Sequence, residues 1–129
     1  MKEFERKTLV DKGESLKLGE YKRHVMLCMG PKCCSEEEGQ EAWSRLKGRL
    51  KEMGLRDGQI YATKAGCLRL CKAGPVAVVY PEGVWYGRMQ GKAIDRLIDE
   101  HLVGGKVVEE FAFAEAPLRG GDEDEPTGF

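Results

Sequence analysis

The stretch from Cys67 to Tyr86, CLRLCKAGPVAVVYPEGVWY, decides the expected fold. Two runs rich in Val, Tyr and Trp, 76–80 and 84–86, stand on either side of a short Pro-Glu-Gly turn. Such runs around a glycine-bearing turn are typical of a β-hairpin. The first part of the stretch belongs to a loop, 64–74, that holds two cysteines. The sequence therefore predicts a cysteine loop that leads directly into a hairpin.

The segments before and after this stretch complete an alternating pattern. The apolar run 24–29 and the segment 59–63 are expected strands. Between them, Ser35 followed by three glutamates predicts the start of a helix, with an N-cap hydroxyl and acids in the first turn. A last helix is expected over 92–102, and 107–113 is either a further strand or a packed extension. A βαβ unit followed by ββα predicts an α/β fold of the thioredoxin-like type, with a four-stranded mixed sheet and flanking helices.

Length and composition indicate one globular domain with two tails. The chain has 129 residues, of which 41% are hydrophobic and 33% charged. We expect a polar N-terminal extension over 1–20, the folded domain over 21–114, and an acidic, disordered tail over 115–129. The tail holds five acids and one base, so the rest of the chain has 20 bases and 17 acids.

Charge and hydropathy also bear on partners and location. The net charge of −1 gives no reason to expect nucleic acid or an anionic membrane as a partner. The N-terminus has no apolar signal-peptide core, and no run approaches membrane-spanning length, so a cytoplasmic protein is expected. In a reducing compartment, clustered cysteines are more often metal ligands or catalytic groups than disulfides.

Four of the five cysteines form two local pairs, Cys28-x4-Cys33 and Cys67-x3-Cys71. One pair follows the first expected strand and the other precedes the hairpin, two places that lie near each other in the predicted fold. Thiolates are soft ligands that suit iron–sulfur clusters and zinc. The pattern therefore predicts one metal centre between two loops. Cys34, directly after Cys33, leaves one ligand position open.

Glycines and bases surround these cysteines. Glycine lets the backbone, with its N–H donors, come close to sulfur, and three glycines are placed for this: Gly30, Gly66 and Gly74. Positive side chains within three residues of a proposed ligand would raise the reduction potential and attract an acidic partner. These side chains are Lys32, Lys64, Arg69 and Lys72.

Three segments resemble a known family: HVMLCMGPKC (24–33), AGCLRLCKAGPVAVVYPEGVWYG (65–87) and AIDRLIDEHLVGG (93–105). They are similar to the thioredoxin-like [2Fe-2S] ferredoxins and, more distantly, to the iron–sulfur subunit of NADH:quinone oxidoreductases. The resemblance implies a one-electron carrier that exchanges electrons with redox partner proteins and forms a homodimer. It also implies one [2Fe-2S] cluster on Cys28, Cys33, Cys67 and Cys71. The sequence departs from the family in its doubled cysteine, its short first loop and its two tails. The resemblance favours Cys33 over Cys34, because x4 is the tighter form of that loop in the related oxidoreductase subunits.

Other functions remain open from the residues alone. A zinc-stabilised interaction module would use the same thiolates, and the vicinal Cys33-Cys34 pair could form a disulfide. The same cluster could also serve as a relay in a hydrogenase or an NADH-oxidising complex. No nucleophile–base arrangement is present, so the chain is not expected to be an enzyme by itself.

His24 and His101 are weak evidence for a metal ligand. His101 is expected to complement a helix dipole. Whether Pro75 follows a cis peptide bond stays open.

Overall fold

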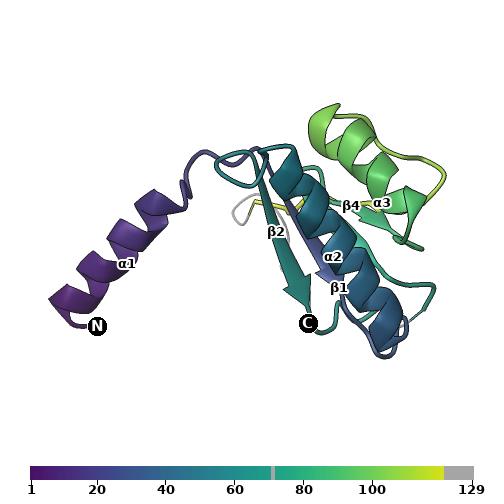
Figure 1. The fold of residues 1–129 in the computed structure, drawn as a ribbon, viewed down its shortest axis with the longest axis horizontal. Coiled ribbons are helices and arrows are strands. Elements are labelled where there is room, and N and C mark those ends of the chain that lie inside the picture. Colours follow the sequence, from purple (N-terminus) through teal and green to yellow (C-terminus); the bar gives the residue numbers. More distant parts are fainter. Residues whose placement is uncertain (71, 121–129) are drawn as a thin grey trace.

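A mixed sheet of five strands runs through the described part of the chain, residues 1–70 and 72–120, in this computed structural model (Figure 1). The strand order is β2-β1-β3-β4-β5. Strands β1 and β2 are parallel, and every other neighbouring pair is antiparallel. The predicted thioredoxin-like α/β fold is confirmed, with a fifth strand beyond the four expected. The strands are β1 (Arg23–Cys28), β2 (Ile60–Ala65), β3 (Ala77–Tyr80), β4 (Val84–Tyr86) and β5 (Ala112–Glu115).

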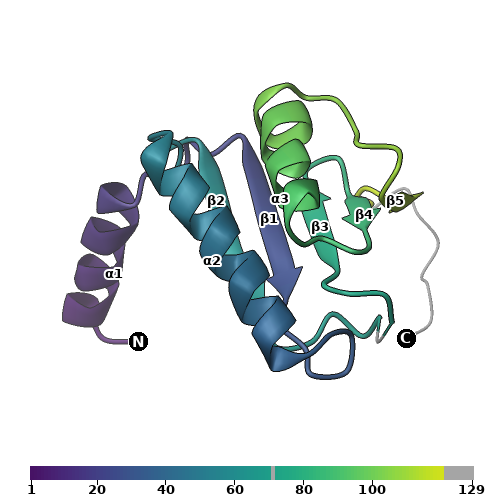
Figure 2. The same cartoon turned by 45° about the vertical axis from the view of Figure 1, so that its right-hand side comes forward.

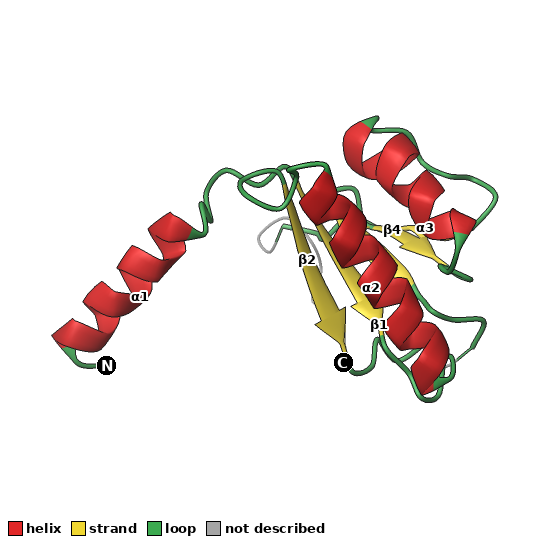
Figure 3. Ribbon diagram, viewed as in Figure 1, coloured by secondary structure: helices red, strands yellow, loops and turns green. Residues whose placement is uncertain are grey.

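Two helical segments cover one face of the sheet (Figures 2 and 3). Helix α2 (Glu36–Glu52) begins at the predicted cap: the Glu38 N–H donates to Ser35 Oγ at 3.1 Å, and the Ser35 N–H donates to Glu38 Oε1 at 2.9 Å. Helix α3 (Lys92–Arg96) continues without a break into the π-helical turn η1 (Leu97–Val103). The last predicted helix is therefore present, but half of it is wound more loosely than an α-helix.

The core lies between this helical layer and the sheet. Val25, Leu27 and Val79 from the sheet are fully buried, as are Leu46 and Leu50 from α2. Fully burying such side chains stabilises the fold by about 1.5–3 kcal/mol each. This packing fixes the end of β1, which holds Cys28, and the end of β2, which Cys67 follows by two residues.

His101 makes contacts that the sequence did not predict. Its side chain is fully buried, with Nδ1 2.7 Å from Tyr86 Oη and Nε2 2.8 Å from Glu82 Oε1. Arg23 Nε donates to the same Glu82 oxygen at 2.9 Å. His101 does lie in the last turn of η1, as the sequence predicted, and its ring in addition links η1 to β4 and to the hairpin turn.

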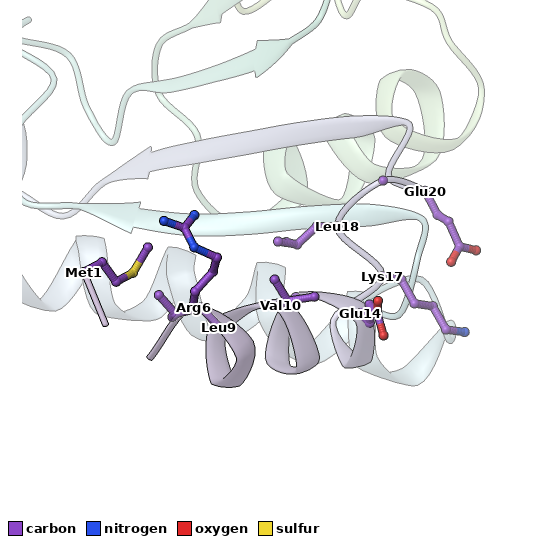
Figure 4. A pocket seen from close by; sticks show the side chains of 10 residues that line it. Met1, Arg6, Leu9, Val10, Glu14, Lys17, Leu18 and Glu20 are labelled. Carbon is purple, nitrogen blue, oxygen red and sulfur yellow. The ribbon is translucent and has the colours of Figure 1, made fainter. Parts of the chain in front are cut away.

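The first twenty residues contain a helix that stands off from the body (Figure 1). Helix α1 (Glu3–Ser15) buries none of its residues. Leu9, Val10 and Leu18 border a groove of about 760 Å³ along it (Figure 4). None of the described cysteines borders this groove, so it is separate from the candidate site. Among the helices of the described residues, none has the length and apolar character needed to cross a membrane.

Candidate metal centre

Both cysteine loops start from the same edge of the sheet. Cys28 is the last residue of β1 and pairs with Ala65, the last residue of β2. The Met29 N–H donates to Ala65 O at 2.9 Å, so the pairing extends past the end of β1. Because β1 and β2 are parallel, their carboxyl ends emerge side by side. Cys67, two residues after β2, is thereby brought near Cys28.

Three of the predicted ligands border one cavity of about 190 Å³, called here the thiol cavity: Cys28, Cys33 and Cys67. Cys28 and Cys33 are buried free thiols whose Sγ atoms lie 2.6 Å apart. Cys67 is exposed, and its Sγ accepts a hydrogen bond from the Arg69 N–H at 3.2 Å. The fourth predicted ligand, Cys71, lies outside the described residues. Within those residues, no three His, Cys, Asp or Glu side chains form a group that could hold a single metal ion.

Cys33 and Cys34 are both buried but face different surroundings. Their Sγ atoms are 3.7 Å apart, and Cys33 borders the thiol cavity. Cys34 is not among the described residues that line the cavity. Its sulfur lies 3.2 Å from the point where a Cβ on Gly30 would stand, and Gly30 itself borders the cavity. The two adjacent thiols therefore are not geometrically equivalent.

Two of the three glycines singled out by the sequence lie in close contact with a cysteine. The Gly74 N–H donates to Cys33 O at 2.8 Å. A Cβ at Gly74 would lie 2.6 Å from Cys33 O and 2.8 Å from Cys33 Cβ. Gly30 has φ +83°, and a Cβ there would lie 2.5 Å from Cys34 O. Gly66 has no such neighbour among the described atoms, although it borders the thiol cavity. The bond from Gly74 to Cys33 thus joins the two cysteine loops directly.

The thiols of Cys33 and Cys34 are in surroundings that oppose their ionisation. Burial, followed by the hydrogen bonds to Cys28 and Cys34, raises the pKa of Cys33 to about 12. Burial also raises the pKa of Cys34. Removing these protons requires a compensating positive charge, which a coordinated metal provides. The thiol set is therefore suited to a metal centre and poorly suited to act as free thiolates.

The comparisons with known proteins decide the family. No family model matches the chain. It is 35% identical over 99 residues to a protein of Priestia megaterium named as a 2Fe-2S ferredoxin, a match that covers 77% of this chain and 76% of the relative. It is 31% identical over 98 residues to "Ferredoxin, 2Fe-2S" of Aquifex aeolicus (strain VF5), covering 67% of this chain and 85% of the relative. The crystal structure of the wild-type thioredoxin-like [2Fe-2S] ferredoxin from Aquifex aeolicus matches with a TM-score of 0.65 and 29% identity, over 72% of this chain and 97% of that one.

The chain belongs to the thioredoxin-like [2Fe-2S] ferredoxin family. The resemblance stated from the three sequence segments is thereby confirmed. The solved structure is matched along almost its whole length, whereas more than a quarter of this family member lies outside the match.

The four bases named from the sequence divide between two surfaces. Lys32 borders the thiol cavity, and Lys64 is exposed on β2. Arg69 and Lys72 border a neighbouring groove of about 560 Å³. This basic groove is defined by Arg69, Leu70, Lys72, Arg88, Phe111 and Phe113.

Sequence reasoning missed Arg88 as part of this family member's candidate site. It follows β4 and is remote from every cysteine along the chain. Its position depends on a tertiary hydrogen bond, in which the Arg88 N–H donates to Ala73 O at 2.7 Å. No local pattern in the sequence signals that bond.

Proposed function

We propose that this chain carries single electrons on one [2Fe-2S] cluster held by Cys28, Cys33, Cys67 and Cys71. The observation that carries the proposal is the thiol cavity, where cysteines from two loops far apart in sequence border one space. Family membership gives that space its chemistry. A bound [2Fe-2S] cluster supplies a one-electron couple, and four thiolates are its usual ligand set.

The protein's own groups fit such a ligand set. The Arg69 N–H already donates to Cys67 Sγ, and a hydrogen bond to a ligand sulfur stabilises negative charge there. Cys28 and Cys33 are buried while Cys67 is exposed. One side of the site is therefore shielded from water, and the other reaches the surface where a redox partner can dock.

Cys33 is the proposed second ligand because it borders the thiol cavity together with Cys28 and Cys67. Cys34 does not border the cavity and serves as the matched control, since it is the adjacent residue with the same side chain. Cys33→Ser is expected to abolish or strongly alter the visible spectrum of the purified protein, and Cys34→Ser to leave it nearly intact. The opposite pair of results would assign the ligand to Cys34.

Metal and sulfide analysis tests the proposal against a structural zinc site. We expect two irons and two acid-labile sulfides per chain, with visible absorption bands that dithionite bleaches. A colourless protein with one zinc per chain would favour the non-redox interaction module instead. Copurification with a large flavin subunit would place the same cluster in a hydrogenase or an NADH-oxidising complex.

The proposed redox partner presents an acidic surface. Lys32, Lys64, Arg69 and Lys72 are all exposed and close in sequence to the proposed ligands. Complementary charge speeds association, most strongly at low salt. Reversing all four charges should slow electron transfer to succinylated cytochrome c, an acidic acceptor, and speed transfer to the basic native cytochrome c. Equal rates with both acceptors across ionic strength would refute a docking role for these bases.

The remaining assignments are also proposals. Residues 1–20 form the extension, 21–114 the cluster domain and 115–129 an acidic tail, of which 121–129 lie outside the described residues. We infer a cytoplasmic homodimer: the family resemblance implies the dimer, and clustered free cysteines suit a reducing compartment. Sedimentation equilibrium of the cluster-loaded protein tests the dimer, and a mass of one chain would contradict it.

A further inference from the structure

The basic groove lies beside the thiol cavity and is lined by both positively charged and apolar side chains. Arg69, Lys72 and Arg88 are exposed on its walls, while Phe111 and the half-exposed Phe113 contribute apolar surface. Leu70 borders both the groove and the thiol cavity. A segment bound in this groove would therefore lie next to the proposed cluster.

Within the described residues the positive charge of the groove is only partly offset, because Arg88 interacts with the Glu38 carboxylate without forming a close ion pair. Glu110 is the acid that borders the groove, and its carboxylate pairs with Arg96. Arg69, Lys72 and Arg88 make no ion pair with any residue of 1–70 or 72–120. Three bases thus remain available to an acidic segment.

The walls of the groove are held in place by backbone hydrogen bonds. Besides the bond from Arg88 to Ala73, the Gly87 N–H donates to Phe111 O at 3.0 Å, and the Met89 N–H donates to Pro75 O at 2.9 Å. These bonds tie the loop after β4 to both the cysteine loop and the segment before β5. A preformed groove binds a flexible segment at a lower entropic cost than a groove that must first assemble.

We propose that this groove binds the acidic segment 121–129 of the same chain. The segment reads GDEDEPTGF, with four consecutive acids, Asp122 to Glu125, followed by Phe129. Its acids complement the three bases, and its aromatic ring complements the apolar surface of Phe111 and Phe113. No other stretch of the sequence combines four consecutive acids with a nearby aromatic residue.

The chain after Phe113, which borders the groove, is long enough for the segment 121–129 to return to the groove. After Phe113 the chain follows β4 to the hairpin turn, where the Ala116 N–H donates to Gly83 O at 2.7 Å. The four residues from Phe113 to Pro117 cover about 13 Å as a strand. The five residues from Pro117 to Asp122 can span up to about 18 Å, enough to return. Being tethered, the segment acts at an effective concentration in the millimolar range.

Binding of the segment would make it a competitor for any acidic redox partner. This consequence rests on the proposed function, because it assumes that electrons leave through the cluster beside Leu70. The binding itself does not depend on electron transfer and can be measured separately.

The test uses the cluster-loaded, full-length protein with its tail charges removed by Asp122→Asn, Glu123→Gln, Asp124→Asn and Glu125→Gln. A dye-labelled peptide with the sequence of residues 116–129 is titrated into this variant and followed by fluorescence anisotropy. We expect saturable binding at about 20 mM salt that is lost at about 300 mM salt. Adding Arg88→Glu should weaken the binding about tenfold, since it turns one exposed attraction into a repulsion.

Lys47→Glu is the matched control. It makes the same change of charge at an exposed position of α2, but Lys47 does not border the groove, so the peptide should bind as before. Absence of binding at low salt would overturn the proposal, as would equal weakening by Lys47→Glu and Arg88→Glu. The visible spectrum, recorded on the same samples, separates this failure from failure of the proposed function: a colourless protein contradicts the cluster, whatever the peptide does.

Discussion

Gly74→Ala tests whether the contact between the two cysteine loops is needed for the site. The added Cβ would stand 2.6 Å from Cys33 O and 2.8 Å from Cys33 Cβ. Both distances are shorter than any ordinary contact of a Cβ, and neither neighbour can rotate away, because one belongs to the backbone and the other is attached to it. The loops must therefore move apart.

The loss of stability caused by Gly74→Ala can be worked out from these contacts. Inserting a methyl group into a filled space costs about 1–3 kcal/mol. The hydrogen bond from the Gly74 N–H to Cys33 O, 2.8 Å long, would lengthen or break, which adds about 1 kcal/mol. We expect Gly74→Ala to lower the free energy of unfolding by about 2–4 kcal/mol and to reduce the iron content per chain.

Gly48→Ala provides the matched control. Gly48 lies within α2, and a Cβ there would meet nothing within 4 Å. The same chemical change should stabilise the protein by about 0.5–1 kcal/mol and leave the iron content unchanged. Urea unfolding and iron analysis of both variants decide the question. If Gly74→Ala keeps full stability and full iron content, the loop contact does not support the site.

Two further predictions concern the buried polar network around His101. His101→Leu should lower the free energy of unfolding by about 2–4 kcal/mol in urea, because buried polar groups lose their partners, while the visible spectrum stays unchanged; a bleached spectrum would show that the network supports the cluster site. Burial opposes ionisation of Glu82, but the hydrogen bonds from Arg23 and His101 outweigh it and lower the pKa of that carboxyl below its ordinary 4.5. The ionised Glu82 carboxylate therefore stabilises the fold above about pH 4.5, and this contribution is lost as the pH falls through the lowered pKa. The difference in free energy of unfolding between the wild type and Glu82→Gln should shrink below about pH 4.5. A difference that grows on acidification would contradict this sign.

Much of the fold was predictable because the signals for it are local. The cap at Ser35 and the run 84–86 match a helix start and a strand in the structure. Strand β5 was harder to place: 107–113 was left as either a strand or an extension, and the strand occupies Ala112–Glu115. A strand of four residues carries too little periodicity to fix its limits. The sequence also left the peptide bond before Pro75 undecided, and Gly74–Pro75 is cis.

The features that sequence analysis missed depend on contacts between distant segments. His101 looked like a residue near a helix end, and only the packing of η1 against β4 buries it against Tyr86. Arg88 joins Arg69 and Lys72 only because the loop after β4 folds against the cysteine loop. Such pairings have no period and no spacing that a single sequence reveals. The cysteine pairs were recognisable because each pair is local and the predicted fold brings the two loops together.

The central claim is that two loops, far apart along the chain, hold one dinuclear iron centre. Electron paramagnetic resonance of the dithionite-reduced, full-length protein tests it most directly. We expect a signal from one unpaired electron per chain, as one-electron reduction of a single [2Fe-2S] cluster produces. A reduced protein without any signal, in a sample whose metal is zinc, would contradict the account.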